Sequence, residues 1–114
     1  GDGSQAYDFI YVEDVARCNV LSAISDINFG MYNVGTELQT SIKELCDTIL
    51  ELKKSSVKVI YKPYAADDAR QFVQNRIGSK AKAEKELDFS YKYSLREGLQ
   101  KLIDWRLISG VDKS

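Results

Sequence analysis

A mixed α/β domain is the fold class that the sequence predicts, and two kinds of segment predict it. Short runs rich in β-branched and aromatic residues alternate with longer segments whose apolar residues recur every three or four positions. The first pattern is typical of strands and the second of amphipathic helices that bury one face. The 114 residues are enough for one domain, residues 1–114, with one hydrophobic core.

Three short strands are expected, at residues 9–12, 31–35 and 57–61. β-Branched or aromatic side chains predominate in each of these runs. Pro63 should end the third strand, because proline has no backbone N–H to donate to a neighbouring strand. The polar stretch 64–76 lacks periodicity and is expected to be a loop, with a short strand around Phe72 and Val73.

A first helix should follow the first strand, with Glu13 or Asp14 as its cap and an end near Ser25. The apolar residues assigned to its buried face are Ala16, Val20, Ala23, Ile24 and Ile27. A short charged helix is expected from Ser79 or Lys80 to Leu87. The linker 88–93 follows it, and its aromatic rings are expected to pack on the surface of the domain.

Two further helices are predicted by a local signal, the capping box. Ser41 is followed three residues later by Glu44, and Ser94 is followed by Glu97. In such a pair each side chain accepts a hydrogen bond from the other residue's backbone N–H. The helix after Ser41 should end near residues 53–56, where lysines favour the C-terminal end of the helix dipole.

The composition excludes several classes of function. Sixteen basic and seventeen acidic residues give a net charge of -1, so no nucleic-acid partner is expected. No apolar run reaches the roughly 18 residues of a membrane span, so no membrane partner is expected either. There are no histidines, which removes histidine-based catalysis and most zinc sites, and no metal site is predicted. Cys18 and Cys46 are expected to be reduced thiols of a cytoplasmic protein.

Four blocks of the chain resemble a known family. Residues 1–15 contain Gly-Asp-Gly and then Asp-Phe-Ile-Tyr-Val before an acidic helix start, and residues 31–35 read Met-Tyr-Asn-Val-Gly. Residues 40–45 read Thr-Ser-Ile-Lys-Glu-Leu, and residues 94–105 run from Ser-Leu-Arg-Glu-Gly-Leu to Ile-Asp-Trp. In this order they resemble the C-terminal part of nucleotide-sugar epimerases and dehydratases, in the extended short-chain dehydrogenase/reductase family.

The resemblance implies a small C-terminal substrate-binding domain whose Rossmann half is absent. That half binds NAD on glycines spaced Gly-x-x-Gly-x-x-Gly, and no three glycines here have this spacing. The family's proton transfer uses Tyr-x-x-x-Lys, and no tyrosine here has a lysine four residues later. We therefore expect no cofactor and no catalytic residue in this chain, which should be inactive alone. NAD would serve the complete enzyme.

The resemblance also implies the residues that contact substrate. Arg70 matches an arginine that reaches the diphosphate of the nucleotide sugar, and a guanidinium can bind two phosphate oxygens at once. Asp68 could orient that guanidinium or accept a hydrogen bond from a ribose hydroxyl. Tyr7 stands where the family most often has a second arginine; its hydroxyl can donate one hydrogen bond, and its ring can stack. Without the resemblance, the loop that contains Asp68 and Arg70 would read as a solvated loop.

The expected function is the substrate-binding part of an NAD-dependent epimerase similar to UDP-glucose 4-epimerase, with a UDP-sugar as ligand. A dehydratase or decarboxylase of the same family is an alternative. Another alternative is a non-enzymatic module that binds a partner or itself, because the missing half would leave apolar surface exposed. The expected partner is therefore the missing Rossmann half or a second copy of the chain in a homodimer.

Overall fold

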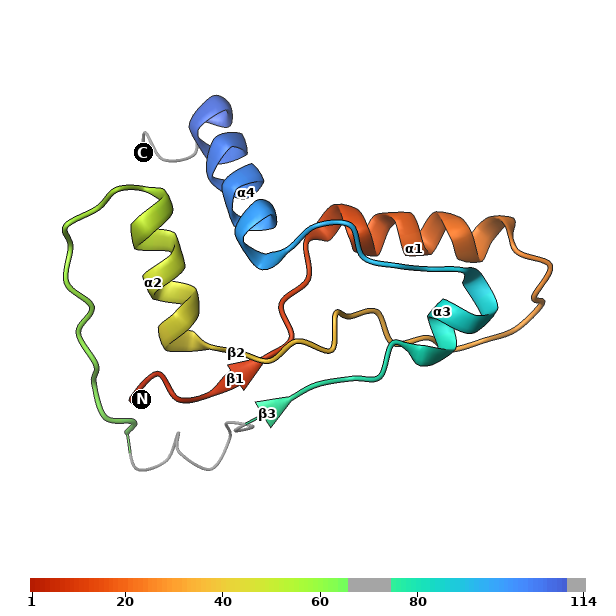
Figure 1. Ribbon diagram of the computed structural model, residues 1–114, viewed down its shortest axis with the longest axis horizontal. Coiled ribbons are helices and arrows are strands. Elements are labelled where there is room, and N and C mark those ends of the chain that lie inside the picture. Colours follow the sequence, from red (N-terminus) through yellow and green to blue (C-terminus); the bar gives the residue numbers. More distant parts are fainter. Residues whose placement is uncertain (66–74, 111–114) are drawn as a thin grey trace.

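The structure is a computed structural model that describes residues 1–65 and 75–110. The described residues form four helices and three very short strands, so the predicted mixed α/β class is confirmed. Figure 1 shows how these elements are arranged. In chain order the elements are β1 (Ala6–Tyr7), α1 (Val12–Ile24), β2 (Thr40–Ser41), α2 (Ile42–Leu52), β3 (Asn75–Arg76), α3 (Ala81–Leu87) and α4 (Leu95–Ser109).

The sheet has the strand order β2-β1-β3, in which β1 pairs with β2 antiparallel and with β3 parallel. Its register places Ala6 opposite Ser41 and Tyr7 opposite Thr40 on one side. Backbone hydrogen bonds extend this contact, since the N–H of Ile42 donates to the carbonyl of Gln5 at 2.8 Å. The start of the chain is thereby fixed to the start of α2.

Two of the predicted helix starts are confirmed in detail. The Ser41 hydroxyl accepts from the backbone N–H of Glu44 at 3.1 Å, and the Glu44 carboxylate accepts from the backbone N–H of Ser41 at 2.8 Å. Ser94 and Glu97 form the same reciprocal pair at the start of α4. The predicted short charged helix is α3, so the helices are the part of the fold that local sequence signals specify best.

The three strands predicted from apolar runs are wrong. Residues 9–12 lead into α1, and the strand there is β1 at residues 6–7. Residues 31–35 are extended with alternating exposure, but no backbone–backbone hydrogen bond of this segment lies among the described residues. Residues 57–61 are exposed and form no strand. Sequence preference alone does not make a strand, because a strand also needs a neighbouring backbone to pair with. The strand expected around Phe72 and Val73 lies outside the described residues.

The predicted start and buried face of the first helix are also wrong. α1 begins at Val12 and Tyr11 is its N-cap, without a side-chain capping bond. Its buried residues are Asp14 and Cys18, on the side that contacts α3. Ala16, Val20, Ala23 and Ile24 are exposed and Ile27 is half-buried, because no described part of the chain covers that side.

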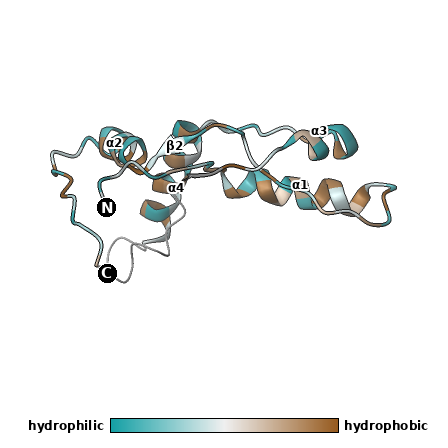
Figure 2. Ribbon diagram, turned by 90° about the horizontal axis from the view of Figure 1, so that it is seen from below, coloured by the Kyte–Doolittle hydropathy of each residue, from teal (hydrophilic) through white to brown (hydrophobic). Residues whose placement is uncertain are grey.

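The apolar surface on and after α1, here called the α1 stripe, is therefore open. Its members are Val12, Val20, Ile24, Phe29 and Met31, with exposed fractions between 58% for Val20 and 87% for Phe29. Figure 2 shows brown, hydrophobic stretches along the ribbon of α1.

The aromatic residues of the linker 88–93 are buried or half-buried rather than packed on the surface, which corrects the prediction for them. The Phe89 side chain is 1% exposed and packs in a cluster with Cys18, Ala83 and Leu87. The guanidinium of Arg17 lies 5.1 Å from the centre of the Phe89 ring and donates a hydrogen bond to the Ser90 carbonyl. This linker therefore connects α3 to α1.

A buried carboxylate completes this connection. Asp14, whose side chain is fully buried, accepts from the backbone N–H groups of Lys92 at 2.9 Å and Tyr93 at 3.1 Å, and from Arg17. Burial opposes the charge of this carboxyl, but the hydrogen bonds from Lys92, Arg17 and Tyr93 outweigh it, so the pKa of Asp14 lies below its ordinary value. We call this group of bonds the Asp14 clamp, which fixes the start of α4 to α1.

The molecule is flat and open for its length. Its extents are 49 × 38 × 23 Å, and its radius of gyration is 17.0 Å. A compact domain of this length has a radius of gyration of about 13 Å. The buried apolar core among the described residues consists of Ala6, Cys18, Ala83, Leu87 and Phe89.

Candidate functional site

Tyr7, one of the predicted substrate-binding residues, lies at the end of β1 beside a hollow of about 510 Å³. Its half-buried ring meets the ring of Phe9 edge-on, with the ring centres 6.0 Å apart. We call this space the Tyr7 hollow. Its lining residues are Tyr7, Asp8, Phe9, Asn33, Val34, Gly35, Ile77 and Gly78.

One wall of the Tyr7 hollow is held by the carboxylate of Asp8. Its oxygens accept from the backbone N–H groups of Thr36 and Glu37, both at 2.8 Å, and from the Thr36 hydroxyl. A side chain at position 35 would place its Cβ 2.5 Å from Asp8 Oδ2, so only glycine allows this approach. Asp8 therefore joins the segment after β1 to the segment 31–37.

Ile77 and Gly78 line the hollow on another side, and two residues that follow them, Lys80 and Lys82, bind to the segment 31–37. Glu37 has a φ of 62°, and its carboxylate accepts from the backbone N–H of Lys80 at 2.8 Å. Lys82 Nζ donates to the Met31 carbonyl at 3.0 Å. Three segments that are far apart in the sequence, 6–9, 31–37 and 77–82, thus form one connected frame around the hollow.

Arg70 and Asp68, the other two predicted substrate-binding residues, lie outside the described residues. The described chain resumes at β3, where Asn75 pairs with Ala6 and Arg76 pairs with Tyr7. The backbone register therefore places residues 75 and 76 beside β1. The structure brings Tyr7 together with Asp8 and Asn33, which sequence reasoning did not select.

Asn33 carried one signal that could have identified it. It is the polar residue in the apolar run 31–35, at a position where alternation places its side chain on the same side as Met31. Both residues are exposed, whereas Tyr32 and Val34 turn inward and pack against the core. Asp8 had no such signal, because its partners lie 28 and 29 residues further along the chain.

A second hollow, of about 550 Å³, lies beside the start of the chain and between two tyrosines. Tyr61 and Tyr64 line it together with Asp2, Gln5 and Lys62. Gly3 has a φ of 80°, and a Cβ there would meet the Tyr61 ring at 2.7 Å, so the first Gly-Asp-Gly block provides a surface on which these rings lie.

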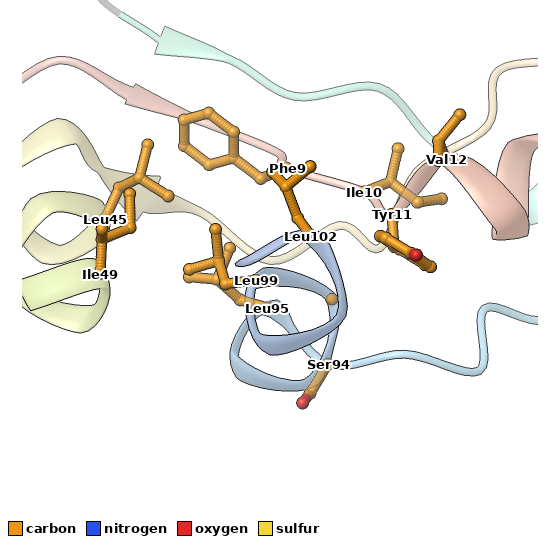
Figure 3. A pocket seen from close by; sticks show the side chains of 11 residues that line it. Phe9, Ile10, Tyr11, Val12, Leu45, Ile49, Ser94, Leu95, Leu99 and Leu102 are labelled. Atoms are coloured by element: carbon orange, nitrogen blue, oxygen red, sulfur yellow. The ribbon is translucent and has the colours of Figure 1, made fainter. Parts of the chain in front are cut away.

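A third hollow, of about 410 Å³, is apolar and opens between α2, α4 and residues 9–12. In Figure 3 the side chains of Leu45 and Ile49 from α2 lie opposite those of Leu95 and Leu99 from α4, with Phe9 above them. Apart from Tyr11 and Ser94, no lining residue has a polar side chain. Such a surface suits apolar side chains and offers no positive charge for a diphosphate.

The described residues contain no group of three or more His, Cys, Asp or Glu side chains that could hold a metal ion. Cys18 and Cys46 are free thiols, and burial raises the pKa of the Cys18 thiol. Within residues 1–65 and 75–110, no helix is long and apolar enough to cross a membrane.

Curated relatives match nearly the whole of this chain. It is 29% identical over 107 residues to a UDP-N-acetyl-alpha-D-glucosaminuronate decarboxylase of Bacillus cytotoxicus, covering 92% of this chain and 33% of that protein. It is 32% identical over 107 residues to a putative UDP-glucose 4-epimerase of Methanocaldococcus jannaschii, covering 92% of this chain and 32% of that protein. The chain thus spans about a third of the length of these relatives. No family model matches it.

Solved structures also match nearly the whole of this chain and about a third of their own length. A UDP-glucose 4-epimerase of Thermotoga maritima, solved with UDP-glucose, superposes with a TM-score of 0.84 at 30% identity over 96% of this chain and 34% of that chain. The enzyme WbmF of Bordetella bronchiseptica, solved with NAD+ and UDP, superposes with a TM-score of 0.79 at 32% identity over 97% of this chain and 31% of that chain.

Proposed function

We propose that this chain is the substrate-binding part of an NAD-dependent UDP-sugar epimerase or decarboxylase. The chain is homologous to the C-terminal portion of these enzymes, which belong to the extended short-chain dehydrogenase/reductase family. Its ligand is a nucleotide-diphosphate sugar, in an enzyme similar to UDP-glucose 4-epimerase. The observation that carries this proposal is the Tyr7 hollow, framed by three separate segments of a chain whose relatives were solved with UDP-glucose and with UDP. A decarboxylase is the alternative, since relatives of both kinds match equally well.

In this proposal Arg70 binds the diphosphate, because its planar guanidinium presents two parallel N–H donors to phosphate oxygens and stays charged at any working pH. Asp68 orients that guanidinium or accepts from a ribose hydroxyl. Tyr7 stands where the family most often has a second arginine, and it offers a hydroxyl donor and an aromatic edge in place of the positive charge. The pairing of β3 with β1 supports this grouping, because it places Asn75 and Arg76, which follow Arg70 by five and six positions, beside Ala6 and Tyr7.

The described residues do not fit NAD. A dinucleotide site needs a glycine-rich turn between a strand and the N-terminus of a helix, where the backbone can approach the pyrophosphate. Tyr11, Ser41 and Ser94 precede α1, α2 and α4, and none of the three stands in such a turn. The turn between β3 and the seven-residue α3 contains one glycine, Gly78. In this proposal the chain supplies substrate contacts, and hydride transfer belongs to a dinucleotide-binding half.

That half, or a second copy of this chain, covers the α1 stripe. The chain exposes 8536 Å², roughly 2,200 Å² more than the about 6,300 Å² expected for a compact monomer of 12.9 kDa. An excess of this size is comparable to what one partner loses in a large obligate interface. The extended segment 31–35 next to the stripe also has no backbone partner among the described residues. The alternative function, a self-associating module without enzymatic role, uses the same surface.

The test is to titrate the isotopically labelled chain with UDP and to follow its backbone amide signals. Binding at the proposed site shifts the signals of residues that frame the Tyr7 hollow, such as Tyr7, Asn33 and Gly78. The signals of residues at the apolar hollow, such as Ile49 and Leu99, should stay in place. A chain whose Tyr7 hollow signals do not respond to millimolar UDP is not a nucleotide-sugar-binding portion.

A further inference from the structure

We propose that Asn33 is an additional ligand-contact residue, whose side-chain amide binds two neighbouring hydroxyl groups of the nucleotide sugar. This inference rests on the proposed function and specifies what the Tyr7 hollow recognises. Asn33 lines that hollow together with Tyr7 and Phe9, and its side chain is exposed. It is the carboxamide among the lining residues, and the carboxylate there, Asp8, is occupied by Thr36 and Glu37.

The residue opposite Asn33 leaves its amide accessible. A Cβ built on Gly78 would lie 3.4 Å from Asn33 Cβ and 3.7 Å from Asn33 Nδ2. These are ordinary van der Waals distances, so a larger side chain at position 78 that was directed toward Asn33 would cover its amide. With glycine at position 78, the amide borders open space in the hollow.

The backbone on both sides of Asn33 is anchored. Two residues before it, the Met31 carbonyl accepts from Lys82. Three residues after it, the N–H of Thr36 donates to Asp8, and Gly35 lies directly against that carboxylate. These bonds hold the backbone on both sides of residue 33 before a ligand arrives, so less backbone entropy is lost on binding.

The chemistry of an amide fits a pair of neighbouring hydroxyls. Its NH₂ group donates to one hydroxyl oxygen while its carbonyl accepts from the other hydroxyl. The apolar surfaces of Phe9, Val34 and Ile77 border the same hollow and suit the C–H face of a sugar ring. Both the ribose and the hexose of a UDP-sugar carry such hydroxyl pairs, so either sugar could be the one that Asn33 contacts.

The test measures dissociation constants of the full 114-residue chain for UDP and for UDP-glucose by calorimetry. Asn33→Ala and the similarly sized Asn33→Leu should both weaken binding roughly tenfold, the loss expected for neutral hydrogen bonds. A loss for both ligands identifies the ribose hydroxyls, whereas a loss for UDP-glucose alone identifies the hexose. Asn28→Ala, in the exposed turn after α1, is the control and should bind like the parent chain.

Failures of the two proposals can be told apart. If the parent chain binds UDP-glucose and both folded Asn33 variants bind it equally well, the role of Asn33 is refuted while the proposed function stands. If the parent chain binds neither ligand, both are refuted. The amide spectrum of each variant shows whether it is folded, and Asn33→Leu keeps the side-chain volume in case the smaller variant is unstable.

Discussion

Asp14 shows how much a single buried side chain contributes to this open molecule. Its carboxylate accepts from two backbone N–H groups of the linker and from Arg17, without exposure to solvent. Removing one partner of a buried, hydrogen-bonded charge leaves the others unsatisfied. We expect Asp14→Asn to lower the free energy of unfolding by about 2–4 kcal/mol, measured by urea denaturation. Asp26→Asn, in the exposed turn after α1, should change it little.

The same residue predicts a dependence on pH. The pKa of Asp14 is lowered in the folded state because its hydrogen bonds outweigh the effect of burial. Its contribution to stability is therefore complete above the unfolded pKa of about 3.9 and is lost as pH falls through the lower, folded value. Unfolding midpoints of the parent chain should decrease in acid more than those of Asp14→Asn. If the unfolding midpoints of the two proteins change equally with pH, the stabilising role of the Asp14 clamp is contradicted.

Arg70 carries the residue-scale prediction for binding. A charge-assisted hydrogen bond contributes about 1.5–3 kcal/mol, so Arg70→Ala should weaken UDP binding roughly tenfold to a hundredfold. Arg70→Lys should recover only part of the loss, because an ammonium lacks the paired donors. Lys85→Ala, on the exposed side of α3, is the control. All titrations use one salt concentration, since phosphate contacts are screened. If Arg70→Ala binds UDP as well as the parent chain does, the loop that contains Arg70 does not contact phosphate and is a solvated loop.

Among the elements, the capped helices are the part that the sequence predicts best. Ser94 and Glu97 satisfy each other's backbone N–H groups at the start of α4. Ser94→Ala should therefore lower the free energy of unfolding by about 1 kcal/mol, again by urea denaturation. Ser56→Ala, exposed beyond the end of α2, should have no measurable effect, and equal stabilities of the two variants would contradict a stabilising cap.

The elements that the sequence misplaces share one physical cause. Ser41 and Ser94 act within four residues, so their effect is visible in the sequence alone. A strand at residues 31–35 needs a second strand beside it, and a buried helix face with Val20 and Ile24 needs another surface to cover it. Among the described residues, no strand pairs with the backbone of residues 31–35, and Val20 and Ile24 are exposed. The apolar pattern of these residues alone therefore could not predict which of them the rest of the chain covers.

The candidate site was predictable to a similar extent. Tyr7 could be selected from its place in the first block, and the structure places it at a hollow. Asp8 could not be selected, because its partners lie 28 and 29 residues further along the chain. Asn33 was marked only as a polar residue in an apolar run, and its place beside Gly78 depends on a contact about 45 residues away in the sequence.

At the scale of the whole molecule, the open surface predicts association. Large apolar side chains exposed close together promote self-association. We expect the isolated chain to form dimers or larger species in light scattering over a concentration series. The double variant Val20→Asp, Ile24→Asp should shift it toward the monomer, whereas Ile60→Asp, exposed but away from the stripe, should not. A strictly monomeric parent chain that binds no hydrophobic dye would contradict a partner surface on α1.

The most direct test of the account is one pair of calorimetric titrations of this chain, with UDP-glucose and with NAD. A substrate-binding portion should bind UDP-glucose saturably but weakly, because it supplies only part of the pocket. It should give no isotherm with NAD, because it lacks the glycine-rich turn. A saturable NAD isotherm in the micromolar range, or no binding of UDP-glucose at millimolar concentration, would contradict the account.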